Sequence, residues 1–152
     1  MSESVAHPEF DDSTLVLGIE TSCDETAAAL VMGGYDVVSS VVSTQVEIHA
    51  EFGGVVPEVA SRAHLDVLNP VIARSIVEAG VEDSRIDAIA CTVGPGLVGA
   101  LLVGVSAAKS ASISLAKRPI LTNFWSVPGT PSRWFRPSKS AGRLRKKAAR
   151  RT

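Results

Sequence analysis

The chain has 152 residues, 45% of them hydrophobic, which is enough to build the core of one ordinary domain. Its net charge of −1 hides a segregation of charge: all 16 acidic residues lie in residues 1–121 with six basic ones, whereas residues 122–152 hold nine basic residues and no acid. The composition excludes a fully disordered chain, and the longest apolar run, residues 97–108, is too short to span a bilayer.

Three regions follow from composition. Residues 1–13 are polar and acidic, unlike a secretory signal, and predict a disordered leader. A folded lobe is expected over residues 14–121, and a basic, disordered or out-of-frame tail over residues 122–152. Cys23 and Cys91 lack the spacing of metal ligands, so we expect free thiols in a reducing cytoplasm.

Hydrophobic periodicity predicts secondary structure along the lobe. Short β-branched runs predict strands, and apolar residues three or four apart predict helices. Pro57 and Gly80 suit the two ends of the first helix, although Pro70 implies a kink or a break within it. The predicted strands are residues 14–20, 27–32, 36–44, 87–93 and 119–121, and the predicted helices are residues 57–80 and 97–116.

The predicted order β-β-β-α-β-α-(β) is the pattern of a ribonuclease-H-like lobe. Short turns, Gly33-Gly34 among them, join the first three strands into an antiparallel meander. The later strands alternate with helices, which pack on the sheet. The fold class expected is therefore α/β, a mixed sheet with helices packed on it.

The first motif is GIETSCDET, residues 18–26, where a buried strand ends in a turn rich in acids and hydroxyls. Three carboxylates, those of Glu20, Asp24 and Glu25, fall within six residues. They repel one another unless a metal, backbone amides or a cationic ligand offsets them. A nucleotide-binding hairpin is the functional interpretation, and a solvated acidic turn is the alternative.

Two further motifs have equally plain alternatives. Residues 94–99, GPGLVG, follow a strand and open a helix, which suits either an anion near the helix N-terminus or a tight turn needed only for packing. Residues 49–64, HAEFGGVVPEVASRAH, hold His49, Glu58 and His64 without compact zinc spacing, and they predict either a cleft-lining loop or packed imidazoles.

The second helix and the tail also allow two interpretations each. Small residues such as Gly104 and Ala108 let another element approach closely, either the sheet or a partner helix, with core packing as the default. The tail holds four of the chain's seven aromatic residues beside its basic run, so it suits either RNA binding or a non-native reading frame.

Together these motifs resemble the N-terminal lobe of the tRNA N6-adenosine threonylcarbamoyltransferase family, formerly called O-sialoglycoprotein endopeptidases or glycoproteases. The resemblance spans roughly residues 14–110 and carries three long motifs in the family's order. It implies an actin-like (ASKHA) fold of two ribonuclease-H-like lobes with the active site between them. It also implies transfer of a threonylcarbamoyl group from threonylcarbamoyl-adenylate to N6 of the adenosine 3′ of the tRNA anticodon.

The resemblance assigns roles to the motif residues. It implies that Glu20, Asp24 and Glu25 are the catalytic group and that His49, Glu58 and His64 line the cleft. Substrate or nucleotide binding would fall to Ser22, Thr26, Gly94, Pro95 and Gly96. The implied partners are a paralogous non-catalytic subunit, other proteins of the threonylcarbamoylation complex, tRNA and the adenylate, with no membrane.

The sequence departs from the family after its second predicted helix. Members carry an HxxxH-type motif whose imidazoles bind iron or zinc, but no histidine follows His64 here, and the second lobe is missing. We expect a truncation or frameshift between about residues 111 and 122, and a fragment that neither holds the metal stably nor catalyses the transfer alone. A lobe that only binds the paralogous subunit is the alternative, and a metalloprotease, as the older name suggests, is less favoured.

Overall fold

The computed structural model describes residues 11–123, which begin with an antiparallel meander of three strands. These strands are β1 (Leu15–Glu20), β2 (Glu25–Met32) and β3 (Asp36–Thr44). Gly33 and Gly34 both adopt positive φ, at 59° and 77°, in the turn between β2 and β3, a conformation that glycine tolerates without steric cost. The predicted leader residues 1–10 and tail residues 124–152 lie outside the described part of the chain.

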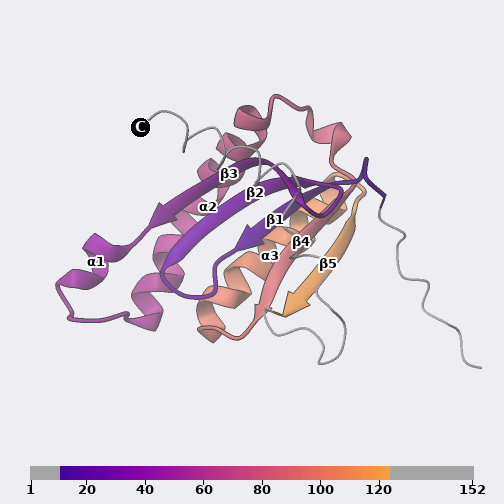
Figure 1. Cartoon of the computed structure of the whole chain (residues 1–152). Helices are drawn as coiled ribbons and strands as arrows, with labels where there is room; N and C mark the ends of the chain where they lie inside the picture. Colours follow the sequence, from indigo (N-terminus) through magenta and orange to yellow (C-terminus); the bar gives the residue numbers. More distant parts are fainter. Residues whose placement is uncertain (1–10, 124–152) are drawn as a thin grey trace, which may run out of the picture.

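The remaining strands add to the other side of β1 in parallel. After α1 (Val46–Ala50), the long helix α2 (Pro57–Ala79) and a 3-10 turn, η1 (Asp83–Arg85), lead to β4 (Ala88–Gly94), and α3 (Val98–Ser114) leads to β5 (Arg118–Asn123). The sheet order is β3-β2-β1-β4-β5, with β1, β4 and β5 parallel (Figure 1). This mixed sheet confirms the predicted ribonuclease-H-like lobe.

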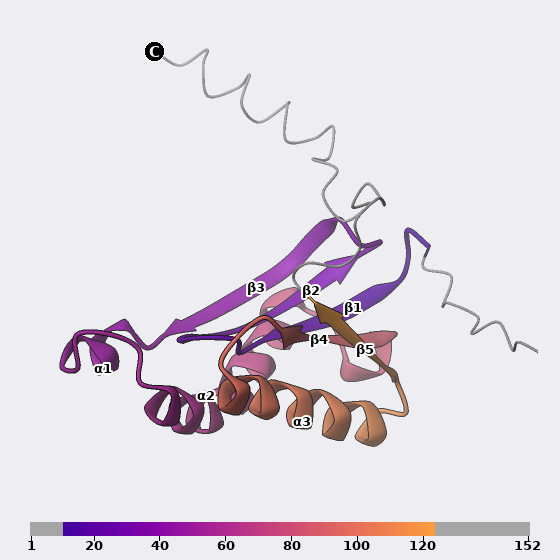
Figure 2. The ribbon, with the colours of Figure 1, turned by 90° about the horizontal axis from the view of Figure 1, so that it is seen from below.

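Both long helices cover one face of the sheet, as the view along its edge shows (Figure 2). The core lies between them and alternate strand residues, which are Leu15, Leu17, Ile19, Leu30, Val41, Ile89 and Cys91, packed against Leu68, Val71 and Ala108 from the helices. No helix within residues 11–123 covers the opposite face. None of the helices in this region is long and apolar enough to cross a bilayer.

Some element boundaries differ from those predicted. Helix α1 was not expected, because five residues are too few to show a helical period. Helix α2 runs unbroken through Pro70, and both Pro70 and Asp66 are exposed. Proline has no amide hydrogen to donate to the Asp66 carbonyl, and the exposed position leaves that carbonyl open to solvent. Residues 11–13 form a hydrogen-bonded turn in which the Asp11 carboxylate accepts the Ser13 amide at 2.9 Å.

The small residues of α3 face the core of the lobe. Ala100, Gly104, Ala108 and Ser112 recur every four residues and are all buried. A Cβ on Gly104 would lie 2.4 Å from Thr21 Oγ1, so this glycine makes room for Thr21, directly after β1, rather than for a partner helix. Bulky variants at Gly104 or Ala108 would therefore disturb the core, and a test of partner binding needs the outward residues of this helix.

Helix α3 ends in a Schellman motif that has alanine where glycine is preferred. The Lys117 amide donates to the Ser112 carbonyl at 2.8 Å and the Ala116 amide to the Ile113 carbonyl at 3.2 Å. Ala116 consequently adopts φ 52°, the left-handed region that costs an L-residue about 1 kcal/mol.

We predict that Ala116→Gly stabilises the chain by about 1 kcal/mol, because glycine enters the left-handed region freely. Urea unfolding followed by circular dichroism measures the change. Ala73→Gly is the matched control, because Ala73 is exposed within α2 and the same substitution there should destabilise by about 1 kcal/mol. Equal signs for the two variants would contradict the prediction.

Candidate functional site

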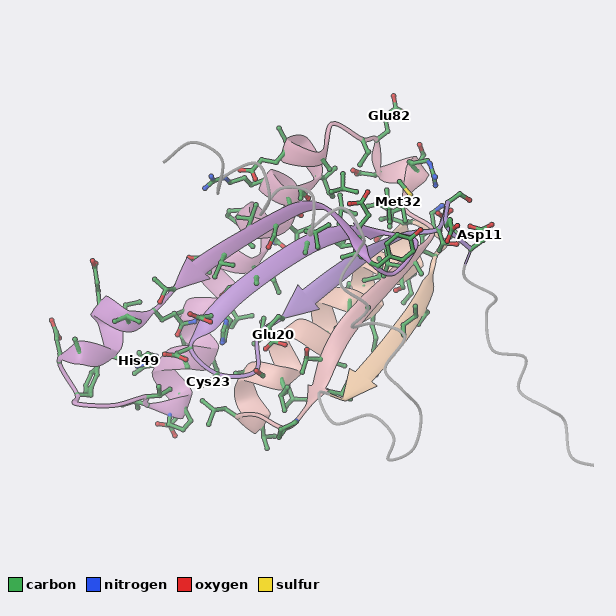
Figure 3. The ribbon with its side chains drawn as sticks, in the orientation of Figure 1. Asp11, Glu20, Cys23, Met32, His49 and Glu82 are labelled. Carbon is green, nitrogen blue, oxygen red and sulfur yellow. The ribbon has the colours of Figure 1, made fainter. Side chains whose placement is uncertain are left out.

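The sequence motifs meet at one edge of the sheet because β1 and β4 are parallel. Ile19 pairs with Cys91, so Glu20 at the end of β1 lies beside Thr92 near the end of β4. The turn 21–24 and the loop 94–97 therefore leave the sheet side by side. Figure 3 shows Glu20, Cys23 and His49 at this end of the molecule, opposite Asp11, Met32 and Glu82.

The turn and the loop are locked together through their backbones. The Leu97 amide donates to the Ser22 carbonyl at 2.8 Å. A Cβ on Gly96 would lie 2.5 Å from the same carbonyl oxygen and 2.8 Å from Ser22 Cβ, so only glycine permits this approach. The GPG loop, with Pro95 and Gly96 exposed and Gly94 half-buried, thus forms one wall together with the acidic turn.

A second anchor lies beneath this wall. The Thr21 side chain is 1% exposed and its hydroxyl donates to the Ala100 carbonyl in the first turn of α3 at 2.8 Å. Because Gly104 receives the same side chain one turn later, the start of the acidic turn is clamped to α3. Thr21 was not predicted as a site residue, since nothing in its sequence context distinguishes it from its hydroxyl neighbours.

The Glu20 carboxylate is held by two donors. Its Oε1 accepts the Ser22 amide at 2.5 Å, and its Oε2 accepts the Thr92 hydroxyl. Both donors fix the orientation of the carboxylate. Thr92 was missed from the sequence, although the parallel register places it beside Glu20.

Glu20 and Thr92 close one end of an open hollow of 230 Å³ on the face of the sheet without helices. Its remaining lining consists mainly of small residues on three adjacent strands, Gly18, Ala27, Ala29 and Ala90. Small side chains leave the backbone accessible there. The hollow accordingly offers an apolar floor with a fixed carboxylate and a hydroxyl at its rim.

Asp24 and Glu25 lie on the solvent side of the turn, Asp24 half-buried and Glu25 exposed. The exposed Cys23 thiol next to them has its pKa raised, chiefly by its hydrogen bond to the Asp24 carboxylate and then by burial. A raised pKa keeps the thiol protonated at neutral pH, so it is a donor to Asp24 and a poor nucleophile.

Thr26, His49 and His64, predicted as binding or cleft-lining residues, lie behind the turn in the protein interior. They are 0%, 4% and 0% exposed, and the Thr26 hydroxyl is 2.7 Å from His64 Nδ1. Their side chains do not face the hollow, because Thr26 alternates onto the helix-covered face of β2. Glu58, in contrast, is exposed in the first turn of α2.

Residues 11–123 contain no group of three or more histidine, cysteine, aspartate or glutamate side chains arranged to hold a metal ion. Both histidines have their ring nitrogens engaged in hydrogen bonds within the interior. The residues of this region therefore do not fit an iron or zinc ion as its ligands. What they provide is a fixed carboxylate, two solvent-side carboxylates and a glycine loop at a helix N-terminus.

We predict that Gly96→Ala destabilises the chain by about 1–3 kcal/mol, because the new methyl group meets a backbone carbonyl that cannot move aside. Urea unfolding measures this change. Gly54→Ala is the matched control, since nothing lies within 4 Å of a Cβ at that position, and it should stay within about 0.5 kcal/mol of the parent. An equal effect of both variants would show that the two loops are not locked.

Comparison with solved structures agrees with this architecture. The chain superimposes on YeaZ from Pseudomonas aeruginosa with a TM-score of 0.53 and 21% identity, covering 72% of this chain and 43% of that one. A second Pseudomonas aeruginosa structure, described as similar to peptidase YEAZ, gives a TM-score of 0.54 at 22% identity. Similarity at this level supports the fold alone.

Sequence comparison identifies the family. A family model described as tRNA N6-adenosine threonylcarbamoyltransferase matches residues 36–122. A protein of the same name in Pelobacter propionicus is 67% identical over 96 residues, which are 63% of this chain and 28% of the relative. Another in Clostridium perfringens is 54% identical over 112 residues, which are 74% of this chain and 33% of the relative. The chain thus spans about a third of these curated relatives, and it belongs to the tRNA N6-adenosine threonylcarbamoyltransferase family.

Proposed function

We propose that residues 14–121 form the first lobe of an enzyme that transfers a threonylcarbamoyl group to tRNA, and that the lobe supplies one wall of the active site. The observation that carries this proposal is the locked pair of loops, in which Leu97 bonds to Ser22 and brings the GPG loop against the acidic turn. The substrate proposed is threonylcarbamoyl-adenylate, and the acceptor is N6 of the adenosine 3′ of the anticodon.

The reaction replaces a carbon–oxygen bond with a carbon–nitrogen bond. The lone pair of the adenosine amine attacks the carbamoyl carbon, the bond to the adenylate phosphate oxygen breaks, and adenosine monophosphate leaves with that electron pair. One amine proton must go to a base. Asp24 is our candidate for this base, with Glu25 beside it, because both lie on the solvent side of the turn that a substrate can reach.

Other groups of the wall suit binding and orientation. Glu20 is held by Ser22 and Thr92, so it accepts a substrate donor without first losing conformational freedom. The first backbone amides of α3 have no acceptor within the helix, and they follow directly after the GPG loop. They can therefore donate hydrogen bonds to the adenylate phosphate. Gly94 and Gly96, on either side of Pro95, have no side chains that would obstruct that approach.

The metal of the family belongs to the part of the proposed enzyme that lies beyond this lobe. Such an ion, iron or zinc, would supply Lewis-acid chemistry in that other part. Because the described histidines do not fit it as ligands, we assign no step in this lobe to the metal. We propose that the lobe acts in the cytoplasm, together with the part of the enzyme that its relatives carry beyond the matched region and with partner subunits.

The proposed function is tested in a chimera in which residues 15–114 replace the matching part of the Pelobacter propionicus relative. We expect the chimera to form threonylcarbamoyladenosine in tRNA, measured by mass spectrometry of its nucleosides. Asp24→Asn should lower the rate by about 100-fold or more through loss of the base. Glu47→Gln, a change at an exposed carboxylate of α1, is the matched control and should leave the rate unchanged.

Two outcomes would contradict this function. A correctly folded chimera without activity would show that the wall does not serve the transfer, and full activity of the Asp24→Asn chimera would remove Asp24 from its proposed role. Product formed by the 152-residue chain as the sole transferase would overturn its proposed dependence on the remaining part of the enzyme.

A partner-binding role for the same lobe is favoured by the outward faces of its helices. Large apolar side chains are exposed there, with Leu65 64% and Val77 77% exposed on α2, and Leu102 59% and Ile113 82% exposed on α3. Exposed apolar residues gathered on one side of a lobe mark an association surface. We propose the paralogous non-catalytic subunit as the partner that covers them.

We predict that Leu102→Glu and Ile113→Glu weaken this association at least tenfold, because each places a charge in an apolar interface. Light scattering after size exclusion with the paralogous subunit measures complex formation. Ser40→Glu on β3 is the control, since this exposed residue lies away from both helices. Unchanged binding of both helix variants would exclude this face as the interface.

A further inference from the structure

We propose that Gln45 is a positioning residue that joins His49 to His64 in a one-way chain of hydrogen bonds and thereby holds the acidic turn in place. Gln45 belongs to none of the sequence motifs and follows directly after β3. This inference rests on the proposed function, which gives the acidic turn its catalytic role. The geometry of the turn itself is measured below without any assay of activity.

The chain of contacts is buried and continuous. Gln45 is 2% exposed, and its Oε1 lies 3.1 Å from His49 Nε2, while its Nε2 lies 3.2 Å from His64 Nδ1. His64 Nε2 in turn lies 3.1 Å from the carbonyl oxygen of Cys23. At the other end, the Val56 amide donates to His49 Nδ1 at 3.4 Å. The interior thus connects the segment between α1 and α2 with the acidic turn.

Backbone groups at both ends determine the direction of this chain. The Val56 amide can only donate, so His49 Nδ1 accepts and His49 Nε2 carries the proton that Gln45 Oε1 accepts. The Cys23 carbonyl can only accept, so His64 Nε2 carries a proton and His64 Nδ1 is the acceptor. The Gln45 amide and the Thr26 hydroxyl share the single lone pair of that nitrogen. A reversed Gln45 amide would set an acceptor against His64 Nδ1 and a donor against His49 Nε2–H.

The same arrangement keeps His64 neutral. Burial lowers its pKa from the usual 6.5, while the Cys23 carbonyl and the carboxylates of Glu20 and Asp24 oppose this shift. A proton on Nδ1 would face the Gln45 amide donor. Acid should therefore disturb the chain at the point where Gln45 meets His64.

Gln45 also contacts the turn through its own backbone, because its amide donates to the Asp24 carbonyl at 3.0 Å. The turn is thus held from two sides: Gln45 and His64 bind the carbonyls of Asp24 and Cys23, and Leu97 binds that of Ser22. Three consecutive carbonyls directed into the protein leave the turn's carboxylates to face outward. This is the orientation that the proposed reaction needs.

The first experiment determines the tautomers in the 152-residue chain by nitrogen-15 NMR at pH 7.5. We expect His49 and His64 both to carry the proton on Nε2, and His64 to lose its charge at a pH below the usual 6.5. A proton on Nδ1 of either ring, or an ordinary titration of His64, would overturn the proposal. Acidification should lower the free energy of unfolding from about pH 6.5 downward, because His64 binds a proton in the unfolded chain at a higher pH than in the native chain.

The second experiment removes the link with Gln45→Met, which keeps the side-chain volume. We expect the Leu97 amide, which bonds to the turn at Ser22, to exchange its hydrogen at least tenfold faster. The Asp87 amide, bonded to the Leu15 carbonyl at the opposite end of β1, reports intact folding and should be unchanged. Glu47→Met, an exposed neighbour in α1, is the matched control. Unchanged Leu97 exchange in a folded Gln45→Met variant would overturn the proposal.

Gln45→Glu decides the case in which Gln45→Met fails to fold. Its carboxylate still accepts from His49 but offers His64 Nδ1 an acceptor, so His64 should take up a second proton nearer neutral pH. An unchanged titration of His64 would overturn the proposal. These readouts come from the isolated chain, whereas the chimera measures transfer, so failure of the positioning and failure of the function remain distinguishable.

Discussion

The parallel pairing of β1 with β4 is the constraint on which the site depends. Parallel strands end at the same edge of a sheet, so the acidic turn after β1 and the GPG loop after β4 must leave it as neighbours. Their close approach then requires a residue without a side chain at Gly96, since a Cβ there would strike the Ser22 carbonyl. The remaining features of the site, including the clamp at Thr21 and the support of Glu20 by Thr92, follow from this adjacency.

The sheet carries its helices on one face, and this asymmetry separates two kinds of chemistry. The helix-covered face holds the aliphatic core and the buried polar chain of Gln45 and the two histidines. The other face presents a floor of glycine and alanine with Glu20 at its rim. In the proposed enzyme the reacting groups gather at the edge where the two faces meet, and the interior histidines act on them only through the backbone of the turn.

The buried polar side chains of this lobe form hydrogen bonds with one another and with the backbone. Among the described residues no buried side-chain nitrogen or oxygen lacks a hydrogen-bond partner. Gln45 donates to His64 and accepts from His49. These directions are fixed because a backbone amide bonds to one end of the chain and a backbone carbonyl to the other. An unpaired polar group would cost about 1–3 kcal/mol in such surroundings, so the network favours a single conformation of the turn over its alternatives.

The sequence by itself determined the fold class, the order of the long elements and the family, because these depend on hydrophobic period and on motifs that are continuous in the chain. It did not determine which faces the motif residues occupy. The alternation of β2 turns Thr26 inward, and the packing of α2 turns His64 toward the turn, so residues that lie together in a motif divide between surface and interior. Gln45, Thr92 and Thr21 acquire their roles only through contacts distant in sequence, and such contacts leave no local signal. The tertiary structure alone decided them, since pairing and packing set which side chains meet.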